Sequence, residues 1–271
     1  MTLTRTVLIF VWAVLASSAS VAQSTAATEA PTESQQVAMA LLLDMATQLG
    51  DAQKFQVEML VGYDAVQGDG QKIEFGERRH VSVERPSLML NDVQGSDGSR
   101  ESIVFDGKTI SVGNSRDNVF ATAPQPGDID KTVRYFVSQL HMRLPLAAML
   151  MAGFAEELQK RVTEIDLVEE TDILGEPANH LAGRMKDIDF QVWISTDGRA
   201  LPLRIIITYR EDAGQPQFRA NFANWNFNPS FLQKTFRFEP PAGAREVPLA
   251  AAFTLDTAMD TKTDTSAGET P

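Results

Sequence analysis

The ten residues 54–63, KFQVEMLVGY, carry the clearest structural signal in this chain. Their apolar side chains stand two residues apart, at Phe55, Val57, Met59, Val61 and Tyr63. A period of two is typical of a β-strand whose side chains point alternately to the two faces of a sheet. One face of this strand is therefore apolar, and it needs neighbouring strands and a covering layer to remove it from water.

The same period recurs on both sides of this strand, which predicts an extensive sheet. Asp106-Gly107 between two such runs is a strong signal for a two-residue hairpin, and Arg85-Pro86 ends another run. Strands are predicted at 54–63, 73–83, 88–90, 102–105, 109–112, 118–122, 165–167, 190–194, 203–209, 218–222 and 236–238. Helices are too few for a βαβ series, so we expect roughly ten to twelve antiparallel strands.

Helical spacing occurs before the sheet and in the middle of the chain. A first helix is expected between Ser34 as the N-cap and Gly50 as the stop. Its apolar residues recur every four residues, at Val37, Leu41, Met45 and Leu49. Asp128 can cap a second helix. Pro145 suits the first turn of a third helix over residues 146–154, LAAMLMAGF, which is apolar on nearly every side.

The predicted fold class is therefore mainly β with α. A single antiparallel sheet of this size is not expected to stay flat, so it should curl into an open half-barrel. About three helices would cover its apolar face. No linker-like segment interrupts the pattern, which predicts one domain over residues 35–250.

The two ends of the chain are expected to lie outside this domain. Residues 1–22 have the layout of a cleavable signal peptide, with an apolar run at 7–16 and small residues at 20–22. That run is about half of the roughly 20 residues that a membrane span needs. Residues 23–34 and 251–271 are predicted to be a disordered linker and a disordered acidic tail. The protein should therefore be secreted into the periplasm, be soluble there and have no stable membrane insertion.

The composition excludes several classes of function. The chain has 271 residues, with 24 Lys+Arg against 36 Asp+Glu and a net charge of −12, and it has no basic run that would bind nucleic acid. It has no cysteine, which excludes disulfides, thiolate metal sites and the acylated cysteine of a bacterial lipoprotein. His80, His141 and His180 are far apart, and no catalytic motif is present. We predict no enzyme activity, no catalytic residue, no metal and no cofactor.

The most informative residues are apolar. Methionine is flexible and polarisable, so a methionine-rich patch suits an adaptable apolar surface. Two interpretations stay open: these side chains form ordinary core, or they line a lipid-sized cavity and its lid. The candidate ligand-binding residues are Phe136, Met142, Leu146, Met149, Leu150, Phe154, Trp193, Phe218 and Phe222.

A set of short motifs resembles a known family. They are GEPANHL at 175–181, FQVWI at 190–194, LPLR at 201–204, NWNF at 224–227 and FEPPAGA at 238–244, with Arg85-Pro86 and Asp106-Gly107-Lys108 nearer the N-terminus. Together they resemble a family of predicted bacterial periplasmic proteins, catalogued as domain of unknown function 2092, over residues 35–248.

That family is similar to the LolA/LolB group of lipoprotein carriers. The resemblance implies an open antiparallel barrel closed by helices, with an apolar cavity for acyl chains. In these carriers an arginine on a strand near the lid helps to hold the closed state. Arg78, Arg79 and Arg85 all compete for that position here.

The leading interpretation of function is a periplasmic protein that binds or carries a lipid or a lipoprotein acyl chain in an apolar cavity. The alternative is a regulatory or interaction module of the envelope, which senses lipoproteins or binds a partner protein without catalysis. A less favoured possibility is an unrecognised hydrolase, which would need a cluster of titratable groups with shifted pKa values in the cavity.

Overall fold

The structure is a computed structural model that describes residues 30–139 and 142–252. By its contacts the chain divides into two units, Met1–Pro31 and Thr32–Pro271, and the sheet and its helices belong to the second. The predicted signal peptide, most of the predicted linker and the tail beyond residue 252 lie outside the described residues.

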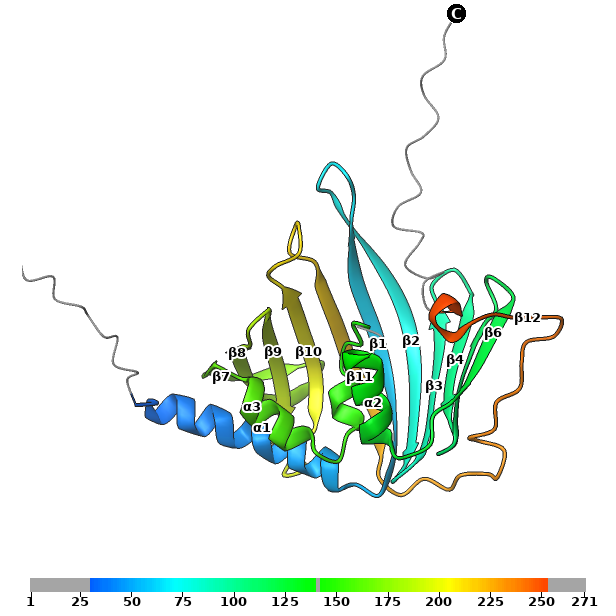
Figure 1. Cartoon of the computed structure of the whole chain (residues 1–271). Coiled ribbons are helices and arrows are strands. Elements are labelled where there is room, and N and C mark those ends of the chain that lie inside the picture. Colours follow the sequence, from blue (N-terminus) through cyan, green and yellow to red (C-terminus); the bar gives the residue numbers. More distant parts are fainter. Residues whose placement is uncertain (1–29, 140–141, 253–271) are drawn as a thin grey trace, which may run out of the picture. The chain divides into compact units, whose positions relative to one another are not determined.

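One mixed sheet dominates the second unit (Figure 1). Its strands are β1 (Lys54–Val66), β2 (Lys72–Glu84), β3 (Leu88–Gly95), β4 (Arg100–Phe105), β5 (Thr109–Asn114), β6 (Val119–Pro124), β7 (Glu164–Ile173), β8 (Glu176–Arg184), β9 (Ile188–Ser195), β10 (Pro202–Tyr209), β11 (Gln217–Asn226) and β12 (Arg245–Glu246). The 12 strands follow the order β12-β6-β5-β4-β3-β2-β1-β11-β10-β9-β8-β7. Neighbours are antiparallel, except that β12 runs parallel to β6. Because β12 and β7 stand at opposite ends of this order, the sheet is open, which confirms the predicted fold class.

Strand β1 lies near the middle of the sheet and joins its two halves. It pairs along its whole length with β2 and on its other side with β11. Phe55, Val57 and Met59 are buried on the concave face, as their two-residue period predicts. Leu60, which follows Met59, lies on the opposite, convex face, and it is 55% exposed.

The first helix, α1 (Glu33–Asp51), begins earlier than the sequence pattern indicates. The predicted N-cap, Ser34, is wrong, because Thr32 is the N-cap. The Thr32 hydroxyl accepts a hydrogen bond from the backbone N–H of Gln35 at 3.2 Å, and the Gln35 side chain accepts one from the Thr32 N–H at 2.9 Å. This reciprocal capping satisfies two backbone donors at once, so residues 33 and 34 belong to the helix and not to the linker.

Three shorter helical elements follow β6. They are α2 (Ile129–Ser138), the 3₁₀ turn η1 (Ala147–Leu150) and α3 (Phe154–Arg161). Asp128 caps α2 as predicted, since its carboxylate accepts a hydrogen bond from the backbone N–H of Lys131 at 2.8 Å. Figure 1 shows α2 in front of β11 and β1, and α1 packs against α3, β7 and η1.

The single helix predicted over residues 146–154 is wrong. Leu146 has a left-handed backbone with φ of 65°, and only η1 is helical before α3 begins at Phe154. The turn between them is held from another helix. The Asp130 carboxylate of α2 accepts hydrogen bonds from the N–H groups of Ala152 and Gly153 at 2.9 and 3.2 Å. These donors are satisfied by a side chain, so they need no helical partner.

The C-terminal region departs from the predicted pattern in two places. Phe236 and Phe238 are not in a strand, because each anchors the chain to a different neighbour: Phe236 packs edge-on against Phe231, and Phe238 packs against Phe120 of β6. The last strand is β12 instead. Residues 249–252 are helical and Ala252 is fully buried, so the first two residues of the predicted disordered tail belong to the folded unit.

The core fills the space between α1, residues 142–153 and the sheet. Leu42, Met45 and Leu49 of α1 are almost completely buried. At the end of α1 the backbone approaches residues 151–152 so closely that a Cβ on Gly50 would lie 2.6 Å from the carbonyl oxygen of Ala152. This contact fixes where α1 ends relative to the segment that follows α2.

Candidate functional site

A large, partly open cavity lies between the concave face of the sheet and the helical elements. Its volume is about 1500 Å³. Ordinary small-molecule pockets have volumes of about 300–1,000 Å³. Its deep end is apolar, with Phe55, Val57, Met89, Phe105 and Ile110 on the sheet side. The lid segment, defined here as residues 142–153, crosses its lower end.

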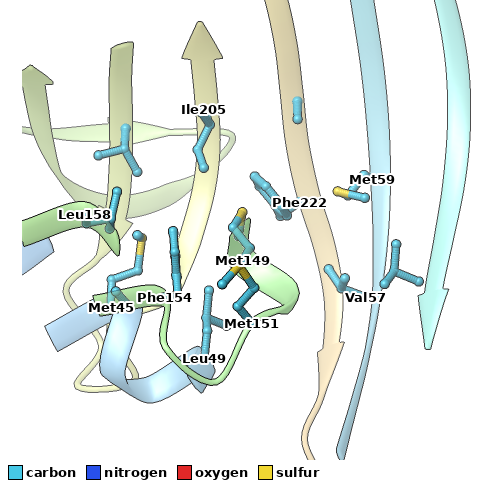
Figure 2. Packing of buried hydrophobic residues seen from close by; sticks show 14 of the residues in the cluster. Met45, Leu49, Val57, Met59, Met149, Met151, Phe154, Leu158, Ile205 and Phe222 are labelled. Atoms are coloured by element: carbon cyan, nitrogen blue, oxygen red, sulfur yellow. The ribbon is translucent and has the colours of Figure 1, made fainter. Parts of the chain in front are cut away.

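Seven of the nine residues proposed from the sequence lie on the wall of this cavity. They are Phe136, Met142, Leu146, Met149, Leu150, Phe218 and Phe222. Met149 lies close to Phe222 in Figure 2, and both belong to the main apolar cluster. The structure therefore brings residues of the methionine-rich segment together with Phe218 and Phe222 of β11 on one cavity wall.

Phe154 and Trp193 do not line the cavity, which corrects their placement. Phe154 is buried in the core beside Met45 and Leu158 (Figure 2). Trp193 lies on the opposite, convex face of β9, where its ring stacks on His180 at 4.1 Å between centroids. The period of two contained this information, since Trp193 is out of phase with the buried residues Val192 and Ile194.

The sequence proposal missed Trp225 as a lining residue. In strict alternation with Phe222, Trp225 would face outward. However, Asn224 has a left-handed backbone with φ of 56°, and the pairing of β1 with β11 shifts register at this point. Such a bulge adds one residue and turns the next side chain to the other face. Trp225 then packs against Phe55 at 5.9 Å and Phe222 at 5.7 Å between ring centroids.

Arg85 is hydrogen-bonded to the lid segment and to the end of α1. It lies at the end of β2, and its guanidinium donates hydrogen bonds to three backbone carbonyls: Ala52 at 3.0 Å, Leu49 at 3.2 Å and Leu150 at 2.5 Å. Burial lowers the pKa of Arg85, and the nearby carboxylates of Asp130 and Asp51 partly oppose this. One side chain thus links β2, the end of α1 and η1.

The other two candidate arginines have different surroundings. Arg78 faces Leu60 across the convex side of the sheet. Arg79 lies on the cavity wall and pairs with Glu77. Of the three candidates, Arg85 is therefore the one whose hydrogen bonds reach the lid segment.

A second connection joins the lid segment to the β10–β11 turn. Arg143 pairs with Asp212, and its guanidinium lies over the Tyr209 ring at 4.4 Å from the centroid. The hydrogen bond from Arg143 holds the pKa of Asp212 below its ordinary value, and the attraction between the two charges acts in the same direction. Burial raises the pKa of Tyr209.

We expect Asp212→Asn to loosen this connection slightly and only at pH values where Asp212 is ionised. Because the folded-state pKa is lowered, the stabilisation is complete above the ordinary value of 3.8 and is lost as the pH falls through the lowered pKa. The Arg143 and Asp212 side chains are 59% and 31% exposed, so solvent screens the pair and the variant should lose less than about 1 kcal/mol of unfolding free energy at pH 7. Urea denaturation at pH 7 and at a pH well below the ordinary value of 3.8 measures this difference. A difference independent of pH would contradict the assignment.

The described residues offer no evident metal centre. No group of three or more His, Asp or Glu in this part of the chain is placed to hold a metal ion. His80 lies near Glu58 and His180 stacks on Trp193, both on the convex face and away from the cavity.

The profile of one protein family matches residues 38–250, and the family is described as "Predicted periplasmic protein (DUF2092)". The chain belongs to this family. Its resemblance to DUF2092 proteins, proposed from the motifs, is thereby confirmed. No curated protein matches the chain. Within the described residues, no helix of this DUF2092 protein has the length and apolar character to cross a membrane.

Several solved structures are similar to this DUF2092 protein. The lipoprotein LppX of Mycobacterium tuberculosis has 16% identity and a TM-score of 0.45, covering 73% of this chain and 99% of that chain. An uncharacterised conserved protein of Thermus thermophilus has 12% identity and a TM-score of 0.43, with coverage of 77% and 98%. A LolA superfamily protein of Nitrosomonas europaea has 12% identity and a TM-score of 0.38, with coverage of 74% and 97%.

Proposed function

We propose that this DUF2092 protein is exported to the periplasm and binds a lipid, or the acyl part of a lipoprotein, in the cavity. The observation that carries the proposal is a largely apolar cavity of about 1500 Å³ that is bordered by the methionine-containing lid segment. An acyl chain gains about 0.8 kcal/mol for each CH₂ that it buries. A cavity of this size and lining can therefore hold an acyl chain without a covalent bond.

The charged groups around the cavity support binding without catalysis. Asp212 pairs with Arg143, Glu77 with Arg79, and Asp64 with Arg219. Burial by itself raises the pKa of Asp64, but hydrogen bonds from Arg219 and Gln217 outweigh it, so the pKa is lowered. A general base near neutral pH would instead need a carboxyl whose pKa is raised.

A second candidate function is recognition of an envelope protein at the mouth of the cavity. The far ends of β1 and β2 carry three exposed apolar side chains, Tyr63, Ile73 and Phe75, at 41%, 40% and 43% exposure. The rings of Tyr63 and Phe75 stack at 6.0 Å. Exposed apolar side chains that cluster beside a cavity are typical of surfaces that contact a partner. This surface and a lipid cavity are compatible with each other.

We expect oleic acid to change the fluorescence of Trp225 and not that of Trp193. These are the two tryptophans outside the predicted signal peptide, and of the two Trp225 lines the cavity. Titration of the purified exported protein should therefore shift the emission spectrum in the wild type and in Trp193→Phe. The shift should be lost in Trp225→Phe. Mass spectrometry of a solvent extract of the untreated protein should detect an acyl lipid.

The matched pair of tryptophan variants separates the cavity from non-specific adsorption. A shift that persists in Trp225→Phe and disappears in Trp193→Phe would place the ligand on the convex face and overturn the proposed site. Absence of both a shift and an extracted lipid would overturn lipid binding itself. Reproducible recovery of one envelope protein without lipid would favour the second candidate.

A further inference from the structure

An ion pair interrupts the apolar wall of the cavity. Glu77 and Arg79 are two residues apart on β2, so both side chains lie on its concave face. The Arg79 Nε donates a hydrogen bond to Glu77 Oε1 at 2.5 Å. The Arg79 and Glu77 side chains are only 23% and 14% exposed, and both line the cavity.

The neighbours of this pair on the concave face are mostly apolar. Arg79 stands between Met59 of β1 and Val93 of β3, and Glu77 stands beside Val61. The Arg79 guanidinium lies 5.7 Å from the centre of the Phe218 ring. Water is thus partly excluded from the pair even before a ligand is bound.

The pair keeps hydrogen-bonding capacity that points to a ligand. Both contacts of Arg79, through Nε and Nη2, go to the same oxygen of Glu77. Among the described residues, Arg79 Nη1 and Glu77 Oε2 have no hydrogen-bond partner within the pair or outside it, and both atoms remain open to water. Nearby on β3, diagonal to Arg79, the buried Oδ1 of Asn91 also lacks one in this part of the chain. A donor, an anionic acceptor and a neutral acceptor therefore remain available on one patch of the wall.

The pair interrupts the apolar wall between the lid segment and the far ends of β1 and β2. Along β2, from Val83 near the lid segment to Glu77, the wall rises by about 20 Å at about 3.3 Å per residue. Below the pair, the strand presents Val81 and Val83, and β1 presents Phe55 and Val57. Acyl chains fit this lower region. A ligand made only of hydrocarbon, if it filled the cavity up to the pair, would cover polar atoms without partners, which is unfavourable.

We propose that Glu77 and Arg79 form a head-group subsite for a zwitterionic lipid, whose phosphate binds Arg79 and whose ammonium group binds Glu77. This inference rests on the proposed lipid-binding function and names the class of lipid. An anionic head group without an ammonium would be repelled by the carboxylate of Glu77. A head group without charge would remove water from both ions and offer neither of them a charged partner. Only a head group with both charges complements the pair.

The test compares three lipids with identical acyl chains: phosphatidylethanolamine, phosphatidylglycerol and diacylglycerol. Each competes with a fluorescent fatty acid for the purified full chain. The wild type should bind phosphatidylethanolamine at least about tenfold more tightly than the other two, since one charge-assisted hydrogen bond accounts for such a ratio. Arg79→Met should lose affinity for phosphatidylethanolamine and should bind phosphatidylglycerol least, because the Glu77 carboxylate is then left without its arginine. Glu77→Gln should move the preference toward phosphatidylglycerol, because the arginine is then left without its carboxylate.

The controls separate this inference from the proposed function. Arg78→Met changes the neighbouring arginine on the convex face and should keep the wild-type preference. If Arg79→Met does not fold, the nearly isosteric Glu77→Gln still decides the question. Equal binding of all three lipids by the wild type, or an unchanged preference in Glu77→Gln, would overturn the head-group subsite while lipid binding stands. Failure of all three lipids to bind would overturn both.

Discussion

Replacing Arg85 with methionine should lower the free energy of unfolding by about 3 kcal/mol or more and should release the lid segment. The guanidinium donates to the carbonyls of Leu49, Ala52 and Leu150, which belong to the end of α1, to its C-cap and to η1. Methionine has a similar length but no donor. All three carbonyls would lose a charged partner in a partly buried region, and this costs more than losing fully exposed hydrogen bonds.

Two measurements check this expectation. Chemical denaturation gives the change in unfolding free energy, and hydrogen exchange of the amides of residues 147–153 reports whether the lid segment opens more often. Arg85→Lys should fall between the wild type and Arg85→Met, because a lysine keeps the charge but lacks the fork that reaches three carbonyls. Arg78→Met, on the convex face of the same strand, is the matched control and should change little. If the amides of residues 147–153 exchange in Arg85→Met at the wild-type rates, Arg85 does not hold the lid segment.

The sheet was predictable because its signal is local. A period of two is written into each strand separately, so β1 and β2 could be assigned without knowing what they pack against. The same period also identifies Trp193 as a residue of the convex face.

Other features depend on contacts between distant residues, and no local pattern contains them. Residues 146–154 are not one helix because Asp130, on α2, satisfies the N–H groups of the turn. Trp225 faces the cavity because a bulge at Asn224 reverses the alternation of β11. Arg85 differs from Arg78 and Arg79 in its hydrogen bonds to backbone carbonyls of α1 and η1, and these contacts cannot be read from the sequence. The cavity is the feature that the sequence predicts least. The same apolar residues are expected whether their side chains fill the core or leave an open space between them.

Replacing Ile103 with glutamate should reduce the affinity for oleic acid by a factor of about one hundred or more while the protein stays folded. Ile103 lies on β4, lines the cavity and is only partly buried, so an introduced carboxylate can remain hydrated in the unliganded protein. An acyl chain that enters the cavity would remove this water. Desolvating an unpaired charge costs several kcal/mol, and about 2.7 kcal/mol corresponds to a roughly hundredfold loss of affinity.

Leu60→Glu is the matched control for this variant, because it introduces the same charge for an aliphatic side chain of the same size. Leu60 is 55% exposed on the convex face of β1, so its replacement should leave the affinity unchanged. Desolvation also raises the pKa of a carboxyl, so the affinity of Ile103→Glu should recover as the pH falls and the introduced group becomes neutral. Oleic acid also becomes neutral as the pH falls, so the wild type and Leu60→Glu measure that contribution, and the affinity of Ile103→Glu should recover by more than theirs changes. The two variants introduce the same side chain and differ only in whether it lies in the cavity or on the convex face. Equal affinities at pH 7 would therefore mean that acyl chains bind outside this cavity.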